Sequence, residues 1–464
     1  MKTFKPYAPN QSYLLPPNIA EWLPEGHLAS FVSDVVDELD LTKIYADYQK
    51  NGECGQPPYH PAMMLKLLIY AYCKGKPSSR KIERATWEDV AYRVLSADQH
   101  PDHDSIAEFR KRHLSLLGDL FYQVLRLCQE AGLVKLGHVA LDGTKVKANA
   151  SKHKAMSYDR MGKAEEQLQK EIQELLRKAQ ETDIAEDAKY GKGKRDEDLP
   201  GELQRRESRL AKIRAAKEAL ETEARQAAET KAHEVVEQLA QRQMQETTTG
   251  KKMKGRMPAV PNVQEAVPDP KAQRNFTDPE SRIMKDGASK GFEQAYNAQI
   301  VVDDESQVIV AEGITQQTND KRQLVEMVKK VQENLGSLPQ KVSADAGYFS
   351  EENVTAKDLA SVELYIPPDR QKHGTKSESI RGRPAENMSV ADRMRRKLRT
   401  KAGQEIYRFR KAIVEPVFGQ IKEARMFRRF SLRGMVKVKA EWTLVCLTHN
   451  LLKLSRSGWH PQSA

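Results

Sequence analysis

The stretch "GHVALDGTKVKANA" spans residues 137–150, and its apolar run is typical of a buried β-strand. An acid, Asp142, follows the apolar residues 139–141 and precedes Gly143. A carboxylate in such a run is costly to bury unless it is paired or bound to a cation. The small residue beside it would let a phosphate backbone approach closely. The stretch therefore predicts a strand that carries a functional acid.

The elements that follow this stretch predict an α/β domain with a mixed five-stranded sheet. Apolar runs separated by turn residues indicate strands, and a capping Ser350 and a terminal Gly336 bound two helices. A basic stretch at 371–401 looks disordered and leads into a long helix that contains Pro416. The predicted elements are strands at 137–150, 295–303, 307–315, 341–347 and 363–368 and helices at 319–336 and 350–360.

Two further acids stand in comparable positions. Asp345 ends an apolar strand, and Glu415 lies on the long helix. In the deduced order the strand of Asp142 is central, that of Asp345 is beside it, and the helix crosses both, so the three carboxylates converge. Ligands that are all oxygens suit Mg²⁺ or Mn²⁺, and two such ions about 3.5–4 Å apart can drive displacement at a phosphodiester. Taken singly, a strand-end Asp is usually a turn former or helix cap, and a Glu on a basic helix is usually a solvated ion-pair partner.

The proline in the long helix invites two interpretations. Lys411, Glu415 and Lys422 recur at spacings that place them on one helix face. A kink at Pro416 would swing Glu415 toward the two aspartates. Alternatively, Pro416 occupies the first turn of a new helix and leaves Glu415 in solvent.

The chain upstream of the first strand is densely helical. Residues 1–45 form an N-terminal arm with an amphipathic helix at 28–39, and residues 46–134 form a helical domain. Ser105 and Glu108 have the spacing of a capping box. Short helices with three basic residues on one of them resemble a helix-turn-helix arrangement, and a helical bundle with a solvated basic face is equally compatible. These basic residues are Arg110, Lys111 and Arg112.

The histidines of this domain lie close together in the sequence, with acids between them. A turn and helix cap explain this stretch better than a metal cluster does. The residues are His100, Asp102, His103, Asp104 and His113.

The catalytic domain is predicted as two segments, 135–157 and 288–452, separated by an insertion at 158–287; residues 453–464 form a tail. Apolar residues at coiled-coil spacing predict two antiparallel helices within 158–243, joined by the polar stretch 183–202. They are Met161, Leu168, Ile172, Leu175 and Ala179 in one helix and Leu203, Leu210, Ile213, Leu220 and Ala224 in the other. A basic linker at 247–290 completes the insertion.

Composition favours a nucleic-acid partner. The 464 residues include 76 Lys and Arg against 65 Asp and Glu, a net charge of +11 that attracts polyanions. The four cysteines show no C-x-x-C spacing, which argues against a zinc site of paired cysteines and against a disulfide framework. Without a signal-type N-terminus or an apolar run of about 18 residues, we expect a cytoplasmic protein with no membrane partner.

Four blocks carry a resemblance: "VALDGTKVKANAS", "AYNAQIVVD", "SADAGYFS" and "YRFRKAIVEPVFGQIK". On these blocks the chain resembles the DDE transposases of bacterial insertion sequences, closest to the eleven-eighty-two group. The resemblance implies a ribonuclease-H-like catalytic domain with Asp142, Asp345 and Glu415 as catalytic and metal-binding residues. It also implies two Mg²⁺ or Mn²⁺ ions per active site.

The same resemblance implies cleavage at terminal inverted repeats and transfer of the 3′-OH ends to a target. The DNA partners would be the double-stranded transposon ends and the target. At least one further copy of the chain would join the synaptic complex, and the protein would act on the bacterial nucleoid. Three residues of the family's Tyr, Arg, Glu, Lys signature fit this chain. At the position of the signature arginine, Arg410 stands one residue too early relative to Glu415, and Lys411 has the expected spacing. With the three basic residues upstream, the candidate DNA contacts are Lys145, Lys147, Tyr407, Arg408, Arg410, Lys411 and Lys422.

Three rival functions remain from the sequence. A nuclease or resolvase with the same fold would cut DNA without joining it. A DNA-binding protein derived from a transposase would bind without strand transfer. A scaffold built on the coiled coil would work without metal.

Overall fold

The computed structural model describes residues 18–49, 57–190, 201–250, 255, 257–286, 291–370, 379–382, 385 and 387–461. They belong to two compact units. Unit 1 comprises Met1–Ala148 and Tyr296–Ala464, and unit 2 comprises Asn149–Ala295.

Unit 1 is built on a mixed sheet with the order β6–β5–β1–β7–β8. Strands β1, β7 and β8 are parallel, whereas β5 and β6 are antiparallel. The strands predicted in these places and the central position of β1 are thereby confirmed. The bounds are β1 His138–Lys147, β5 Phe292–Asp303, β6 Ile309–Thr315, β7 Lys341–Ala344 and β8 Glu363–Tyr365.

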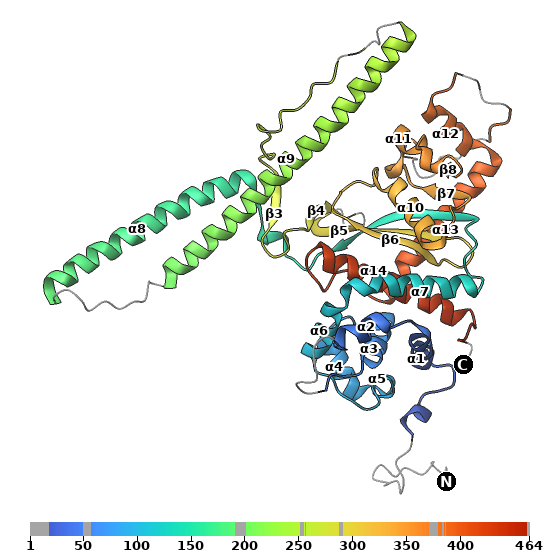
Figure 1. Cartoon of the computed structure of the whole chain (residues 1–464), viewed down its shortest axis with the longest axis horizontal. Coiled ribbons are helices and arrows are strands. Elements are labelled where there is room, and N and C mark those ends of the chain that lie inside the picture. Colours follow the sequence, from blue (N-terminus) through green and yellow to red (C-terminus); the bar gives the residue numbers. More distant parts are fainter. Residues whose placement is uncertain are drawn as a thin grey trace, which may run out of the picture. The chain divides into compact units, whose positions relative to one another are not determined.

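Helices pack against this sheet. Helices α7 (Leu117–Glu130) and α14 (Met435–Arg456) lie side by side, and α14 packs on β6 (Figure 1). Buried Trp442 of α14 donates its indole N–H to the Gln299 carbonyl of β5 at 3.2 Å. Helix α10 (Gln323–Leu335) ends, as predicted, at Gly336, whose φ of 73° suits glycine. Helix α13 (Lys401–Gly419) packs on β1 and β7.

The N-terminal part of unit 1 is a set of short helices. Helix α1 (Leu28–Glu38) packs on α3 and α5, so the segment predicted as an arm contributes to this packing. The helix around Arg110 begins differently from the prediction: Asp102 accepts the Ser105 N–H at 2.6 Å, so Asp102 is the N-cap. The others are α2 Thr42–Gln49, α3 Pro61–Cys73, α4 Ser79–Glu88, α5 Val90–Leu95 and α6 His103–Arg112.

Part of the stretch predicted to be disordered is helical. Helix α12 (Val390–Arg399) follows Ser389, whose hydroxyl accepts the Asp392 N–H at 3.1 Å. Only Met394 and Leu398 of this helix are buried, and so small an apolar face does not stand out among so many charges. Residues 371–378 of the same stretch lie outside the described residues. The short helix α11 (Glu351–Val354) precedes β8.

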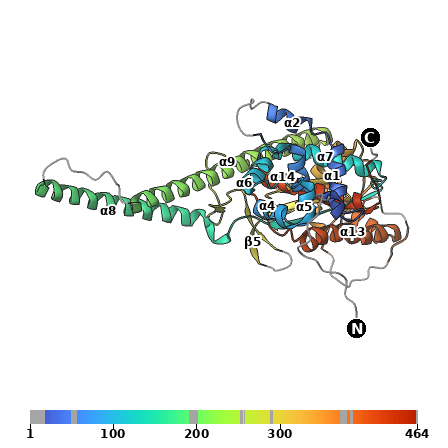
Figure 2. The ribbon, with the colours of Figure 1, turned by 90° about the horizontal axis from the view of Figure 1, so that it is seen from below.

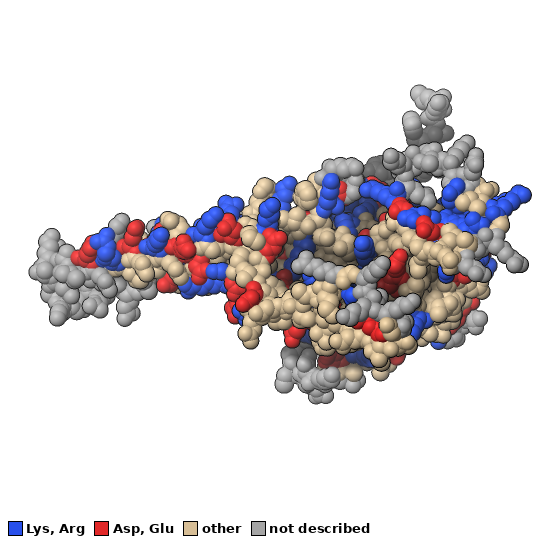
Figure 3. Space-filling view, turned by 90° about the horizontal axis from the view of Figure 1, so that it is seen from above, with Lys and Arg blue, Asp and Glu red and all other residues tan. Residues whose placement is uncertain are grey.

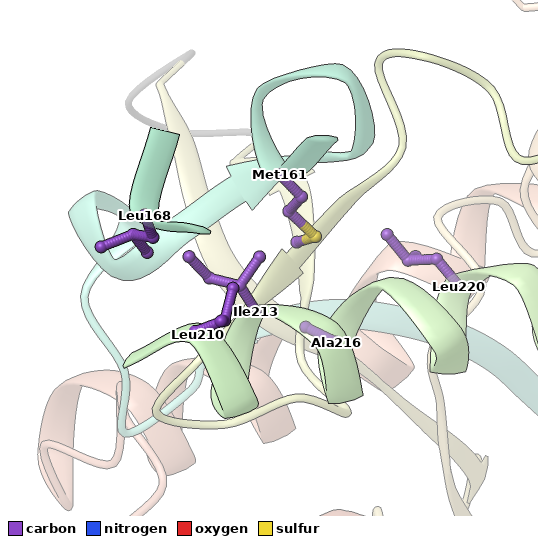
Figure 4. Packing of buried hydrophobic residues seen from close by; sticks show 6 residues of the cluster. All are labelled: Met161, Leu168, Leu210, Ile213, Ala216 and Leu220. Atoms are coloured by element: carbon purple, nitrogen blue, oxygen red, sulfur yellow. The ribbon is translucent and has the colours of Figure 1, made fainter. Parts of the chain in front are cut away.

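Unit 2 is dominated by two long helices, α8 (Tyr158–Tyr190) and α9 (Gly201–Thr249), which lie side by side in both ribbon views (Figure 2). Residues 183–190, predicted as a polar connection, are the end of α8; residues 191–200 lie outside the described part. Acidic and basic side chains are interspersed along this helical pair (Figure 3). Its buried contact joins Met161, Leu168, Leu210, Ile213, Ala216 and Leu220 (Figure 4).

Short strands complete unit 2. Strand β2 (Ala155–Ser157) pairs with β3 (Gln273–Asn275), and β4 (Arg282–Lys285) pairs with residues 292–295 at the start of β5. The predicted linker at 247–290 therefore contains two strands.

Candidate active site

Two of the predicted acids are neighbours on the sheet. Leu141 of β1 and Ala344 of β7 are partners in a parallel pair, and Asp142 and Asp345 come directly after them. Neighbouring strands lie about 4.8 Å apart, so both acids lie at the same place on the sheet. The Gly143 N–H donates to Asp142 Oδ1, and the Gly347 N–H donates to Asp345 Oδ1, both at 2.8 Å.

The Asp142 carboxyl is in an environment that opposes its charge. Burial raises its pKa to about 6, the nearby guanidinium of Arg410 works against this, and the charges of Asp345 and Asp320 add to it. Arg410 Nη1 donates to Asp142 Oδ2 at 3.1 Å, and the Arg410 side chain is only 9% exposed. A cation beside Asp142 therefore favours the ionised form.

The third predicted acid is elsewhere on α13. Glu415 is exposed, and five residues after Arg410 correspond to about 140° around the helix. In the described part of the chain, no three His, Cys, Asp or Glu side chains lie close enough together to hold one metal ion. The structure thus brings Asp142 and Asp345 together and does not add Glu415 to them.

Pro416 lies inside α13, so the interpretation that it starts a new helix is wrong. The kink was expected to bring Glu415 to the aspartates, and the structure does not show this. A proline lacks the N–H that would bond the carbonyl four residues earlier, which is that of Ala412. The side-chain amide of Gln307 donates to this carbonyl at 2.9 Å. A five-residue π-helix, Gln420–Ala424, follows α13.

Sequence reasoning missed a third acid near the pair. Asp320, between β6 and α10, accepts hydrogen bonds at Oδ1 from Asn297 Nδ2 at 2.6 Å and Gln299 Nε2 at 2.8 Å. Its charge contributes to the raised pKa of Asp142, which places it in the same environment. The sequence did contain a signal: Asn297 and Gln299 lie on one face of an otherwise apolar strand and need a polar partner.

Basic side chains surround the acids. Lys145 Nζ lies 3.8 Å from Asp320 Oδ1; burial lowers the pKa of Lys145, and the three aspartates oppose this. Lys422 Nζ donates to Thr144 Oγ1 at 2.5 Å and to the Lys145 carbonyl at 3.1 Å. The Arg410 guanidinium is 5.8 Å from the Tyr407 ring centre. Lys147, at the end of β1, is half-buried.

The other predicted DNA contacts differ in exposure. Arg408 and Lys411 are exposed on α13, and Lys111 and Arg112 are exposed on α6. Arg110 is buried and donates to the Tyr72 hydroxyl at 3.3 Å and the Pro77 carbonyl at 2.8 Å. Its position does not support a phosphate contact.

The three histidines of this region have separate ring partners. His100 stacks on Trp87, and His113 packs edge-on against Phe109. His103 Nδ1 lies 2.8 Å from Glu83 Oε2.

The chemistry of the acids fits a hard divalent cation. The donors are carboxylate oxygens, and Asp142 ionises more readily when a cation lies next to it. Mg²⁺ is commonly held by one or two carboxylates, with water and substrate phosphates as its other ligands. Asp142 and Asp345 supply such a pair.

Two family models match the chain. One, described as a transposase domain (DUF772), matches residues 17–112, and the other, a transposase DDE domain, matches residues 267–451. Asp345 and Glu415 fall within the second match, whereas Asp142 falls in neither. No curated protein and no solved structure matches the chain significantly. Within the described residues, no helix has the length and apolar character needed to cross a membrane.

Proposed function

Because this chain is a DDE-type transposase, as its two matched domains show, we propose that it binds the terminal inverted repeats of an insertion sequence, cleaves the DNA there and joins the freed 3′-OH ends to a target. The observation that carries the proposal is the parallel pairing of β1 with β7. It sets Asp142 beside Asp345 within a group of basic side chains.

DDE transposases use divalent metals, and in this proposal Asp142 and Asp345 hold them. When bound, two Mg²⁺ or Mn²⁺ ions would activate the attacking oxygen and stabilise the leaving one. Asp142, on the central strand, and Asp345, on its parallel neighbour, would supply the carboxylate ligands. Arg410 favours the ionised form of Asp142, and Lys145 and Lys422 are the proposed contacts for DNA phosphates near the acids.

Glu415 is the third acid of the proposal because it lies in the segment that matches the DDE domain. Its carboxylate faces solvent, so DNA binding would have to move this part of α13. Directly after Glu415, Pro416 and the π-helix that follows Gly419 interrupt the regular α-helical hydrogen bonds.

The DNA would lie across exposed basic residues. Arg408 and Lys411 on α13 and Lys111 and Arg112 on α6 are the accessible candidates, with Lys147 and Tyr407 nearer the acids. Counterion release makes such binding fall steeply with salt.

The finer assignments belong to the same proposal. They are membership of the eleven-eighty-two group, a helix-turn-helix role for the N-terminal helices, a coiled-coil insertion in a ribonuclease-H-like domain, at least a dimer during synapsis, and a place on the bacterial nucleoid.

The test is incubation of the full chain with DNA that carries the element's ends and with a target plasmid. Wild type with Mg²⁺ should release 3′-OH ends and form joined products, and Asp142→Asn should bind the ends without cleaving them. Cleavage without joining would instead identify a nuclease or resolvase. Binding without cleavage by wild type would identify a DNA-binding protein derived from a transposase.

A further inference from the structure

We propose that Asp320 is a positioning residue of the transposase active site, which keeps Asp142, Asp345 and Lys145 in the arrangement that admits a divalent cation. This inference rests on the proposed function, because it concerns the same site. Asp320 is outside the DDE signature, but it contacts the residues around both catalytic aspartates.

Asp320 orients a pair of buried side-chain amides. Asn297 and Gln299 on β5 are fully buried, and both donate to Asp320 Oδ1, at 2.6 and 2.8 Å. Gln299 Nε2 also donates to Asn297 Oδ1 at 3.0 Å. Hydrogen bonds to an ionised acceptor are about twice as strong as neutral ones. Asp320 therefore fixes which end of each amide faces which neighbour.

The two amides also pack beside Asp142. Gly143, directly after Asp142, lies against the Gln299 amide, and a Cβ on Gly143 would lie 3.1 Å from Asn297 Oδ1 and closer still to Gln299. Gly143 is thus required by space. The part of β1 that carries Asp142 therefore packs against the two amides that Asp320 orients.

Gln299 and Asp320 also contact the segment that carries Asp345. The Tyr348 hydroxyl donates to Gln299 Oε1, and Asn353 Nδ2 donates both to the Lys321 carbonyl and, at 2.8 Å, to the Tyr348 carbonyl. A Cβ on Gly347 would lie 2.9 Å from Asp345 Oδ1 and 3.6 Å from Asp320 Oδ2. The second oxygen of Asp320 therefore borders the same point as the Asp345 carboxylate.

The charge of Asp320 balances that of Lys145. Lys145 Nζ lies 3.8 Å from Asp320 Oδ1, and this ammonium also interacts with Asp142 and Asp345. Without the Asp320 charge, Lys145 pairs with the two catalytic aspartates alone and competes there with a metal ion. Loss of the charge should therefore weaken metal binding even where the fold is kept.

The experiment measures Mn²⁺ binding to the full chain without DNA, by the loss of the free-ion EPR signal. Asp320→Asn keeps a carbonyl acceptor for the amides and removes the charge. The matched control is Asp119→Asn, which removes an exposed carboxylate of α7 that pairs with Lys43. We expect Asp320→Asn to bind Mn²⁺ about 10–100-fold more weakly than wild type. Adding Lys145→Met to Asp320→Asn should restore affinity.

Folding is followed separately by circular dichroism and melting temperature. The melting temperature of Asp320→Asn is expected to be close to that of wild type. Asp320→Asn should also recover DNA cleavage at high Mn²⁺, whereas Asp142→Asn should not recover cleavage. Equal Mn²⁺ affinity for Asp320→Asn and wild type overturns the inference. Weak Mn²⁺ binding by the double variant Asp320→Asn, Lys145→Met also overturns the inference, because Lys145 would then not be the group that competes with the metal ion.

Failure of the proposed function looks different. If wild type binds Mn²⁺ and Asp320→Asn does not, but neither cleaves end-bearing DNA, the proposed function fails and the positioning role stands. If wild type cleaves and both proteins bind Mn²⁺ equally, the positioning role alone fails.

Discussion

Replacing Asp142 with Asn should abolish catalysis and stabilise the fold. Burial raises the pKa of Asp142 from its ordinary value of 3.8 to about 6, so the folded state holds the charged form less favourably than the unfolded chain does. The side chain is 21% exposed, so solvent screens it little. The difference between the two pKa values corresponds to about 3 kcal/mol, which is an upper bound for the gain on neutralisation.

The sign of the pH dependence follows from the same two values. The unfolded chain ionises Asp142 above pH 3.8, and the folded protein does so only above about pH 6. Stability that is fully present below pH 3.8 is therefore lost as the pH rises from about 4 to 6 and stays lost above that. Asn does not titrate, so Asp142→Asn should match wild type near pH 3.5 and exceed it at pH 7.

The assay is urea denaturation of both proteins between pH 3.5 and pH 8, with EDTA present so that no cation favours the carboxylate. Asp119→Asn, an exposed substitution, controls for the general loss of a negative charge. A less stable Asp142→Asn at pH 7, or a gain that does not shrink toward acid pH, would show that Asp142 is not held in an unfavourable charge state.

Three shorter predictions concern other residues. Arg110→Ala should lower the free energy of unfolding by about 2–3 kcal/mol in urea titrations, because it removes the hydrogen bonds of a buried guanidinium to the Tyr72 hydroxyl and the Pro77 carbonyl, whereas exposed Arg112→Ala should change it by less than about 0.5 kcal/mol. Glu415→Gln should keep the wild-type melting temperature but lose cleavage of end-bearing DNA; retained cleavage would remove Glu415 from the site. Lys411→Ala should reduce the slope of log affinity against log salt by about 0.9, and an unchanged slope would show no phosphate contact there.

The strands of unit 1 could be predicted because their signal is local. Apolar runs bounded by turns marked β1, β5, β6 and β7, and their order set β1 in the centre. The adjacency of Asp142 and Asp345 then followed, since each acid comes directly after the apolar run of its strand and the two strands are parallel neighbours. Helix α12 was not predicted because only two of its side chains are buried among many charged ones.

The position of Glu415 could not be predicted from its spacing to Lys411 and Lys422. Which face of a helix packs inward is set by its apolar residues, and on α13 these are Ile413, Val414 and Val417. Arg410 shares that buried face, so it reaches Asp142, and Glu415 points the other way. The stripe was visible in the sequence, and it predicts the observed orientation better than the charge pattern does.

Asp142, Asp320 and Glu415 differ in how much the fold constrains them. Asp142 stands in a buried strand at a free-energy cost, and that cost is why the sequence marks it as functional. Asp320 satisfies two buried amides, so its role becomes visible only once the strand that carries them is in place. Glu415 is exposed and costs the fold nothing, so physical reasoning gives it no special place and its assignment depends on the family resemblance alone. Residues whose position is unfavourable can therefore be inferred from physics, whereas an exposed catalytic acid has to be found by its effect on the reaction.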